Sequence, residues 1–175
     1  MKKFTAFFVL MLLFAIQSCR KEDQINIPRD LDAKNLTPCP ATGCTFLYKQ
    51  RIDFNMITNI FSPGVFRVFY LEFIYEGTSF HMYIKAPMDG VAFSLSSHDL
   101  TTGKLSCYTS CSSCRLVPLI ILLGEVRGQR IPRDDQQGPE LWVVDARLEI
   151  SSGIRSPVEQ LHIKQIFYPD FVMPN

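Results

Sequence analysis

The chain has 175 residues, of which 47% are hydrophobic, with 18 basic and 17 acidic side chains. Two of the basic residues and none of the acidic ones lie in residues 1–18, so the remainder carries 16 basic against 17 acidic side chains. This balance argues against nucleic acid or an anionic membrane surface as an electrostatic partner. The length is typical of a single domain with a core of its own.

The first 18 residues predict a secretory signal peptide. Two lysines precede an apolar run over residues 4–16, and a small residue, Ser18, precedes Cys19. A helix of these 13 residues would cover only ~20 Å of a hydrocarbon core about 30 Å thick. We therefore expect the run to be cleaved rather than to span a membrane.

Residues 16–19 (Ile-Gln-Ser-Cys) resemble the lipobox of bacterial lipoproteins. The resemblance implies that Cys19 is diacylated and becomes the mature N-terminus, which would anchor the protein in the cell envelope, with the outer membrane as the expected location. Residues 20–23 (Arg-Lys-Glu-Asp) resemble the charged export signal of surface lipoproteins in Bacteroidota. A solvated spacer explains the same charges, so the periplasmic face and the surface face both stay open.

Residues 19–38 predict the lipidated cysteine and a flexible tether, because they are polar and contain two prolines with few aliphatic residues. A single β-rich domain is expected over residues 39–175. Alternating apolar residues predict strands over residues 45–54 and 141–150, and a continuous apolar run over 117–123 predicts a buried strand. Further strands are predicted over residues 65–75, 79–85, 91–95, 104–107 and 161–168, with a Gly-containing hairpin connection at 76–78, turns at 62–64 and 87–90 and a loop over 127–140. About seven to eight short strands indicate an all-β fold, either an antiparallel β-sandwich or a small barrel.

Five cysteines remain after Cys19, and we expect them to form disulfides because an exported protein lies in an oxidising compartment. The disulfide candidates are Cys39, Cys44, Cys107, Cys111 and Cys114. The connectivity stays open, and one thiol should remain free, buried or paired between molecules. Four of the thiolates could instead hold zinc, but the spacing is loose and oxidation competes. We expect structural disulfides, no metal and no cofactor.

The sequence contains no arrangement that is typical of a catalytic site. Residues 96–99 (Ser-Ser-His-Asp) have the residue types of a hydrolytic triad, but neighbours along a strand point to opposite faces, which favours a polar strand end or turn. His81 is expected to be an ordinary strand histidine, since the three histidines have no metal-ligand spacing. Asp145 and Glu149 are expected on the solvated face of their strand.

The aromatic residues of one strand give the main functional lead. Five of them lie between Phe66 and Tyr75, and both faces of that strand are apolar. Burial on both faces explains the pattern, as does an apolar cavity or patch for a ligand or partner. We therefore expect a non-enzymatic envelope lipoprotein with a binding or structural role. The alternatives are a lipocalin-like carrier of a small apolar ligand and, less favoured, a hydrolase whose site residues are distant in sequence.

Replacing Cys19 by alanine tests the anchor. We expect radiolabelled palmitate to enter the wild-type protein in membranes but not Cys19→Ala, because the thiol is the acylated group. The intact mass of the membrane-extracted protein should differ in the same way. An unlabelled wild-type protein would contradict the anchor and indicate a soluble secreted domain.

Overall fold

The computed structural model describes residues 31–39, 43–55, 58, 60–75, 77–111, 114–132, 139–153 and 156–170. The expected signal peptide and Cys19 lie outside these ranges. The described chain forms β1 (Cys44–Asn55), β2 (Ile60–Tyr75), β3 (Thr78–Pro87), β4 (Ala92–Leu95), α2 (Ser97–Asp99), the helical segment η1 (Leu100–Lys104), β5 (Leu105–Cys111), β6 (Cys114–Arg130), β7 (Trp142–Ser151) and β8 (Glu159–Pro169).

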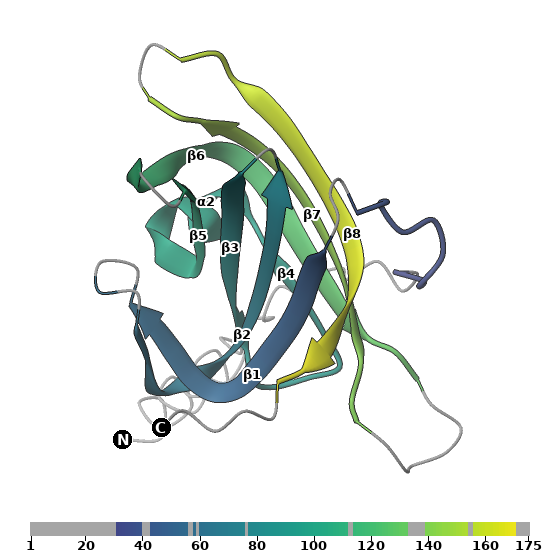
Figure 1. The fold of residues 1–175 in the computed structure, drawn as a ribbon. Helices are drawn as coiled ribbons and strands as arrows, with labels where there is room; N and C mark the ends of the chain where they lie inside the picture. The colour runs from purple at the N-terminus through teal and green to yellow at the C-terminus, as the bar shows by residue number, and fades with distance from the viewer. Residues whose placement is uncertain are drawn as a thin grey trace, which may run out of the picture.

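Seven of these strands close into a barrel, and β4 adds a further strand beside β6 (Figure 1). The order around the barrel is β6-β5-β3-β2-β1-β8-β7, and β7 pairs with β6 to close it. Neighbouring strands are antiparallel except β1 and β8, which run parallel. The expected all-β fold is confirmed. It is the barrel and not the sandwich, and its sheet is mixed rather than wholly antiparallel.

Two expected boundaries were wrong, both because a strand continues where polar or turn-forming residues suggested a break. Residues 62–64 lie inside β2, where the register shifts opposite Ile52 mark a bulge rather than a chain reversal. The loop expected from residue 127 begins later, since β6 continues to Arg130. In this last part of β6, Arg127 pairs across the sheet with Asp145, so a polar outer face still belongs to a strand.

Phe69 lies at the centre of the barrel, where its ring contacts four other aromatic rings. Its centroid lies 5.4 Å from those of Phe93 and Phe167, 5.5 Å from that of Tyr48 and 5.7 Å from that of Trp142. The five residues come from five strands and are all buried. We call them the aromatic floor, because they fill one half of the barrel interior with apolar contacts.

Arg67 seals the barrel beneath the aromatic floor. Its guanidinium carbon lies 4.0 Å from the centroid of the Trp142 ring. Its two terminal nitrogens donate to the carbonyl oxygens of Pro87 and Met88 at 3.4 and 3.3 Å, and Nη2 lies 3.5 Å from a carboxylate oxygen of Glu140. Because the Arg67 side chain is almost fully buried, these contacts offset the loss of its hydration. This end of the barrel is closed.

The approach of β4 to β6 depends on Gly128. A Cβ atom at this position would lie 2.0 Å from an atom of the Phe93 ring, which sits directly across from it. Glycine is therefore the residue that lets Phe93 reach the aromatic floor.

Residues 31–39 lie against the barrel where β1 and β8 diverge, because those two strands pair over only two residue positions (Figure 1). The Thr37 amide donates to the Lys164 carbonyl at 2.9 Å, and the Lys164 amide donates to the Thr37 hydroxyl at 2.9 Å. The Gln165 side-chain amide donates to the Thr37 carbonyl. We call residues 31–39 the strap; residues 31–38 were expected to be part of the tether, and Cys39 to begin the domain.

Both ends of the strap are fixed. At one end Cys39 forms a disulfide with Cys44, the first residue of β1, and both were among the disulfide candidates. At the other end the Leu31 amide donates to the side-chain oxygen of Gln129 at 3.2 Å. The strap therefore forms part of the barrel wall where β1 and β8 do not pair.

Truncating Phe69 tests the importance of the aromatic floor. We expect Phe69→Ala to lower the free energy of unfolding in urea by about 3–5 kcal/mol, because the variant loses ring contacts and leaves a cavity. The control Val65→Ala, at a side chain that is 74% exposed, should change it by less than about 0.5 kcal/mol. Equal effects of the two substitutions would contradict a central role for Phe69.

Candidate functional site at the barrel mouth

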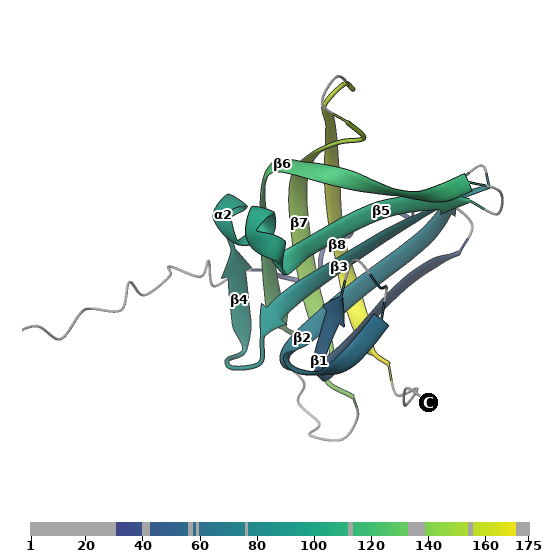
Figure 2. The same ribbon diagram turned by 90° about the vertical axis from the view of Figure 1, so that its left-hand side faces the viewer.

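The barrel is open at the end opposite Arg67. Strands β2, β5 and β7 end here and β3, β6 and β8 begin here, and the β5–β6 pair diverges from the β7–β8 pair (Figure 2). Strand β6 pairs with β5 through residues 114–119, whereas its pairing with β7 starts at Ile120. We call this open end the mouth.

A cavity of about 480 Å³ lies in the mouth. Its apolar lining comes from five strands and consists of Phe73, Phe80, Leu119, Ile150 and Leu161. These side chains pack against the same core that contains the aromatic floor. A cavity of this size with a mainly apolar lining is typical of sites for small ligands.

The outer part of the cavity is polar. Its remaining lining residues are Thr78, Thr109, Ser151, Ser152 and Glu159. The Ser151 hydroxyl already donates to the Gly153 carbonyl at 2.7 Å, so it is held in place by its own turn. A ligand in the mouth would thus meet apolar side chains at depth and oxygen atoms near solvent.

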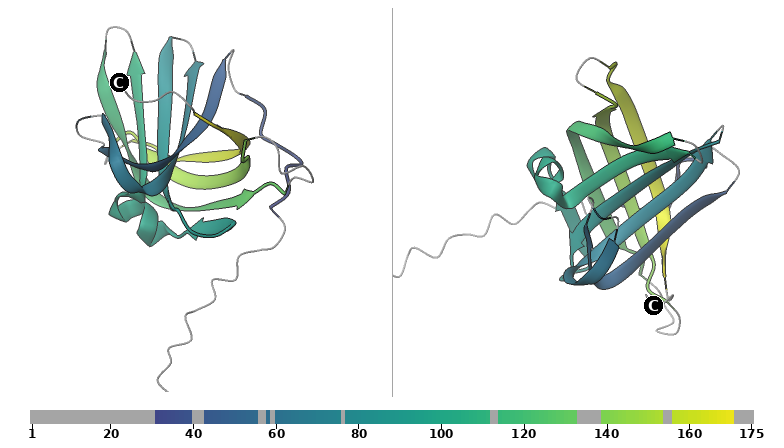
Figure 3. Two further views of the ribbon diagram at one scale, coloured as in Figure 1. Left: turned by 90° about the horizontal axis from the view of Figure 1, so that it is seen from below. Right: turned by 60° about the vertical axis from the view of Figure 1, so that its left-hand side comes forward.

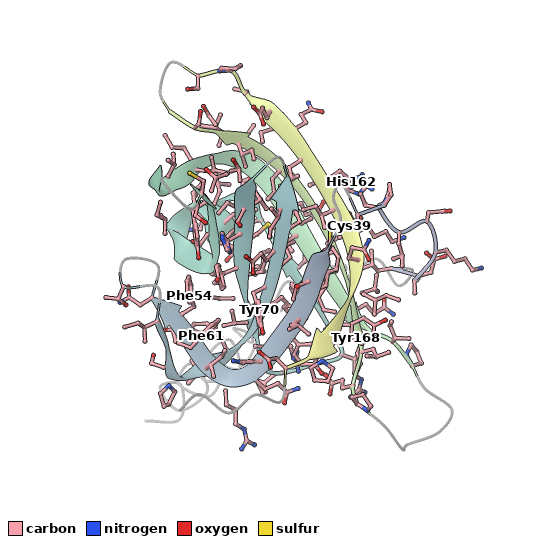
Figure 4. The ribbon with its side chains drawn as sticks, in the orientation of Figure 1. Cys39, Phe54, Phe61, Tyr70, His162 and Tyr168 are labelled. Carbon is pink, nitrogen blue, oxygen red and sulfur yellow. A yellow bond between two sulfur atoms is a disulfide. The ribbon has the colours of Figure 1, made fainter. Side chains whose placement is uncertain are left out.

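A smaller cavity of about 170 Å³ lies under the strap. It shares Phe73 and Leu161 with the mouth cavity and is also lined by Pro38 and Phe46. Figure 4 shows Cys39 and His162 on this side of the barrel, beside β8. The strap therefore forms part of the wall next to the mouth.

Several large apolar side chains near the mouth are exposed. They are at least 40% exposed and comprise Ile74, Leu116, Val117, Ile120, Leu122, Leu123 and Val158. Five of them lie in the first half of β6, and four of these belong to the continuous apolar run over residues 117–123. The burial predicted for that run holds for Leu119 and Ile121, which pack against the core, but not for these four. We call the seven exposed residues the apolar rim, since they leave apolar surface that a partner could cover.

The outer face of β2 is also covered, because the ends of β1 and β2 curl over it (Figure 3). The Phe54 ring stacks on Tyr83 with centroids 3.9 Å apart, and Phe61 packs beside Tyr70 at 5.9 Å (Figure 4). Burial is the main cause that raises the pKa of Tyr70 and of Tyr83. Strand β2 is thus covered on its outer face around Val68 and Tyr70, although Ile74 on the same face is exposed, and Phe73 on its inner face lines a cavity.

Residues 96–99 form a helix cap and the short helix α2, rather than the expected polar strand end or turn, and they are not arranged as a triad. The Asp99 carboxylate accepts hydrogen bonds from the Ser96 amide at 3.0 Å and the Ser96 hydroxyl at 2.8 Å. It also lies 2.7 Å from the Lys104 ammonium, and the hydrogen bond from Lys104 is the main cause that lowers the pKa of Asp99 to about 2. The His98 side chain is exposed.

His81 is a satisfied strand histidine, as expected. Its Nε2 lies 3.0 Å from the Ser110 hydroxyl, and its ring stacks on Tyr108 with centroids 4.5 Å apart. Desolvation lowers the pKa of His81 below its usual value.

The burial of Asp145 was not foreseen. Its side chain is only 3% exposed, although it lies on the outer face of β7 that was expected to be solvated. Its carboxylate is 2.9 Å from His162 Nε2, 3.0 Å from Arg127 Nη2 and 3.5 Å from Arg147 Nη2. Burial alone would raise the pKa of Asp145, but hydrogen bonds from His162 and Arg127 outweigh it and lower the pKa. Only the strand register, which brings Arg127 and His162 beside Asp145, could have revealed this.

The cysteines divide into bonded and free ones. Cys111 is in a disulfide, whereas Cys107 is free and buried on the inner side of β5. Burial raises the pKa of the Cys107 thiol to about 12, so it is unreactive in the folded protein. In the ranges that the structure describes, no three His, Cys, Asp or Glu residues are grouped to hold a metal ion.

Replacing Asp145 by asparagine should be destabilising in a pH-dependent way. At neutral pH we expect Asp145→Asn to lower the free energy of unfolding by about 2–4 kcal/mol, because Arg127 and Arg147 lose their common anion and His162 loses its carboxylate partner. Since the folded pKa lies below the ordinary value of 3.8, the difference from wild type should shrink as the pH falls below about 4. The control Glu149→Gln should have little effect, and a difference independent of pH would contradict a charge-based role.

No helix among the described residues has both the length and the apolar character needed to cross a bilayer. Comparisons with models of protein families, with curated proteins and with solved structures found no match to this chain.

Proposed function

We propose that the protein is a lipid-anchored envelope protein whose barrel mouth binds a small apolar ligand. The observation that carries this proposal is the mouth cavity of about 480 Å³, which five strands line with apolar side chains. The aromatic floor and Arg67 close the opposite end, so a ligand would enter from one side only. A cavity that is open at one end removes the apolar part of a ligand from water, and this removal is the main source of affinity for apolar compounds.

The position in the envelope rests on the sequence. Residues 16–19 resemble a lipobox, and acylation of Cys19 would hold the domain durably at a membrane without a spanning segment. The outer membrane remains the expected location. The apolar rim supports a role in exchange, because it offers apolar surface to a partner protein or ligand arriving at the mouth.

We favour binding over hydrolysis because the described residues that could have taken part in catalysis already have structural partners. Residues 96–99 cap a helix, and His81 is occupied by Ser110 and Tyr108. The acidic side chain that lines the mouth cavity, Glu159, has no histidine beside it in the cavity lining. The arrangement therefore fits a binding site better than a proton-transfer site.

Filling the cavity tests this function. The neutral apolar dye N-phenyl-1-naphthylamine should become fluorescent with wild-type protein, and dodecanol should displace it. We expect Leu161→Trp to weaken dye binding at least about tenfold, because the indole would occupy the space that the dye needs. A second filling variant, Leu119→Trp, should act in the same way.

The matched control is Val91→Trp, which places the same side chain between β3 and β4 at a position that is 55% exposed and lies outside both the mouth cavity and the apolar rim. It should bind the dye like wild type, and thermal unfolding should show that all three variants are folded. If both filling variants and the control bind the dye equally, the mouth is not the binding site. If wild-type protein binds neither the dye nor dodecanol, the proposed function is wrong.

A further inference from the structure

We infer that the mouth selects ligands whose apolar body carries a cationic or hydroxyl head group, and disfavours those with an anionic head group. This inference rests on the proposed function, because it assigns the chemical class of the ligand for the same cavity. It follows from how polarity changes along the strands that line the cavity and from the sign of the charge at its entrance.

The lining changes from apolar to polar in one step on three strands. On β3, Thr78 follows the inward-facing positions of Met82 and Phe80 toward the mouth, because side chains two residues apart share a face. On β8, Glu159 lies two residues closer to the mouth than Leu161 and on the same face, since both line the cavity. A ligand would therefore bind with its apolar end inward and its head group at the entrance.

On β5 the same change occurs from the buried Cys107 to the half-buried Thr109. Thr109 lies directly across from Phe80 on β3 and from Val117 on β6. Its hydroxyl therefore marks the depth at which the lining becomes polar. The hydroxyls of Thr78 and Thr109 can each donate or accept a hydrogen bond from a head group.

The charge at the entrance is negative. Glu159 is the charged residue in the described lining of the mouth cavity, and an ionised carboxylate only accepts hydrogen bonds. An ammonium or hydroxyl head group can donate to it, whereas a carboxylate head group would face a like charge.

Two basic side chains that the structure describes near the mouth are directed elsewhere. Arg147 and His162 border a groove on the outer face of the barrel, and both point their nitrogen atoms at the buried carboxylate of Asp145. His162 also borders the small cavity under the strap, but its Nε2 lies 2.9 Å from Asp145 Oδ1. Neither residue lines the mouth cavity, so neither offers an anionic head group a partner there.

Three probes with the same chain length and different head groups test the inference. Dodecylamine, dodecanol and dodecanoate would each displace N-phenyl-1-naphthylamine from the full-length protein at pH 7.5 and low ionic strength, below the concentrations at which they form micelles. We expect dodecylamine to bind about fivefold more tightly than dodecanoate, with dodecanol between them, a modest ratio because Glu159 is exposed. Added salt should reduce the ratio.

Glu159→Gln should bring the ratio of the amine and carboxylate affinities close to one and leave dodecanol unchanged. The control Glu125→Gln alters a carboxylate on β6 outside the mouth cavity and should keep the wild-type ratio. Dodecanoate binding as tightly as dodecylamine, or a ratio that survives in Glu159→Gln, would overturn the inference while leaving the proposed function intact. Failure of all three probes to displace the dye would overturn both.

Discussion

The contacts of the Phe69 ring join strands that are far apart in the sequence. Its four aromatic neighbours lie on β1, β4, β7 and β8, so this one ring packs against three further strands of the barrel and against the additional strand β4. Arg67 lies two residues earlier on the same inward face and closes that end of the barrel by covering the Trp142 ring. One stretch of β2 thus fills and seals half of the barrel, and the positions of the surrounding strands depend on it.

The other half of the barrel is built differently. Inward-facing residues toward the mouth leave a cavity instead of meeting at the axis, although an unfilled apolar cavity costs stability. The outer surface there is also left apolar, in the first half of β6. Dense packing of one half of the barrel can offset the stability lost by leaving the other half open. This division is what the proposed binding function would need, with a rigid scaffold at one end and a site at the other.

Local patterns in the sequence predicted what depends on neighbours along the chain. The alternation from Trp142 to Ile150 predicted β7 and its two faces, and the glycine at residue 77 predicted the hairpin of β2 and β3. Closure of the barrel was beyond that reasoning, because the parallel contact of β1 with β8 joins residues more than 100 positions apart. The mouth cavity was missed for the same reason, since its lining comes from six strands and the turn after β7, and only the aromatic pattern of β2 hinted at it.

The strap has a mechanical consequence for a protein held by its N-terminus. It runs from Gln129 at the sealed end to Cys39, and the residue bonded to Cys39 lies opposite Phe73 near the mouth. If the protein is anchored at Cys19, a force on the anchor would act along the length of the strap. It would load the hydrogen bonds between Thr37 and β8 in shear, so that several of these bonds would have to break together. The disulfide would then transmit the remaining force to β1. Tension from such an anchor would thus reach the wall of the barrel beside the mouth cavity before it reached the aromatic floor.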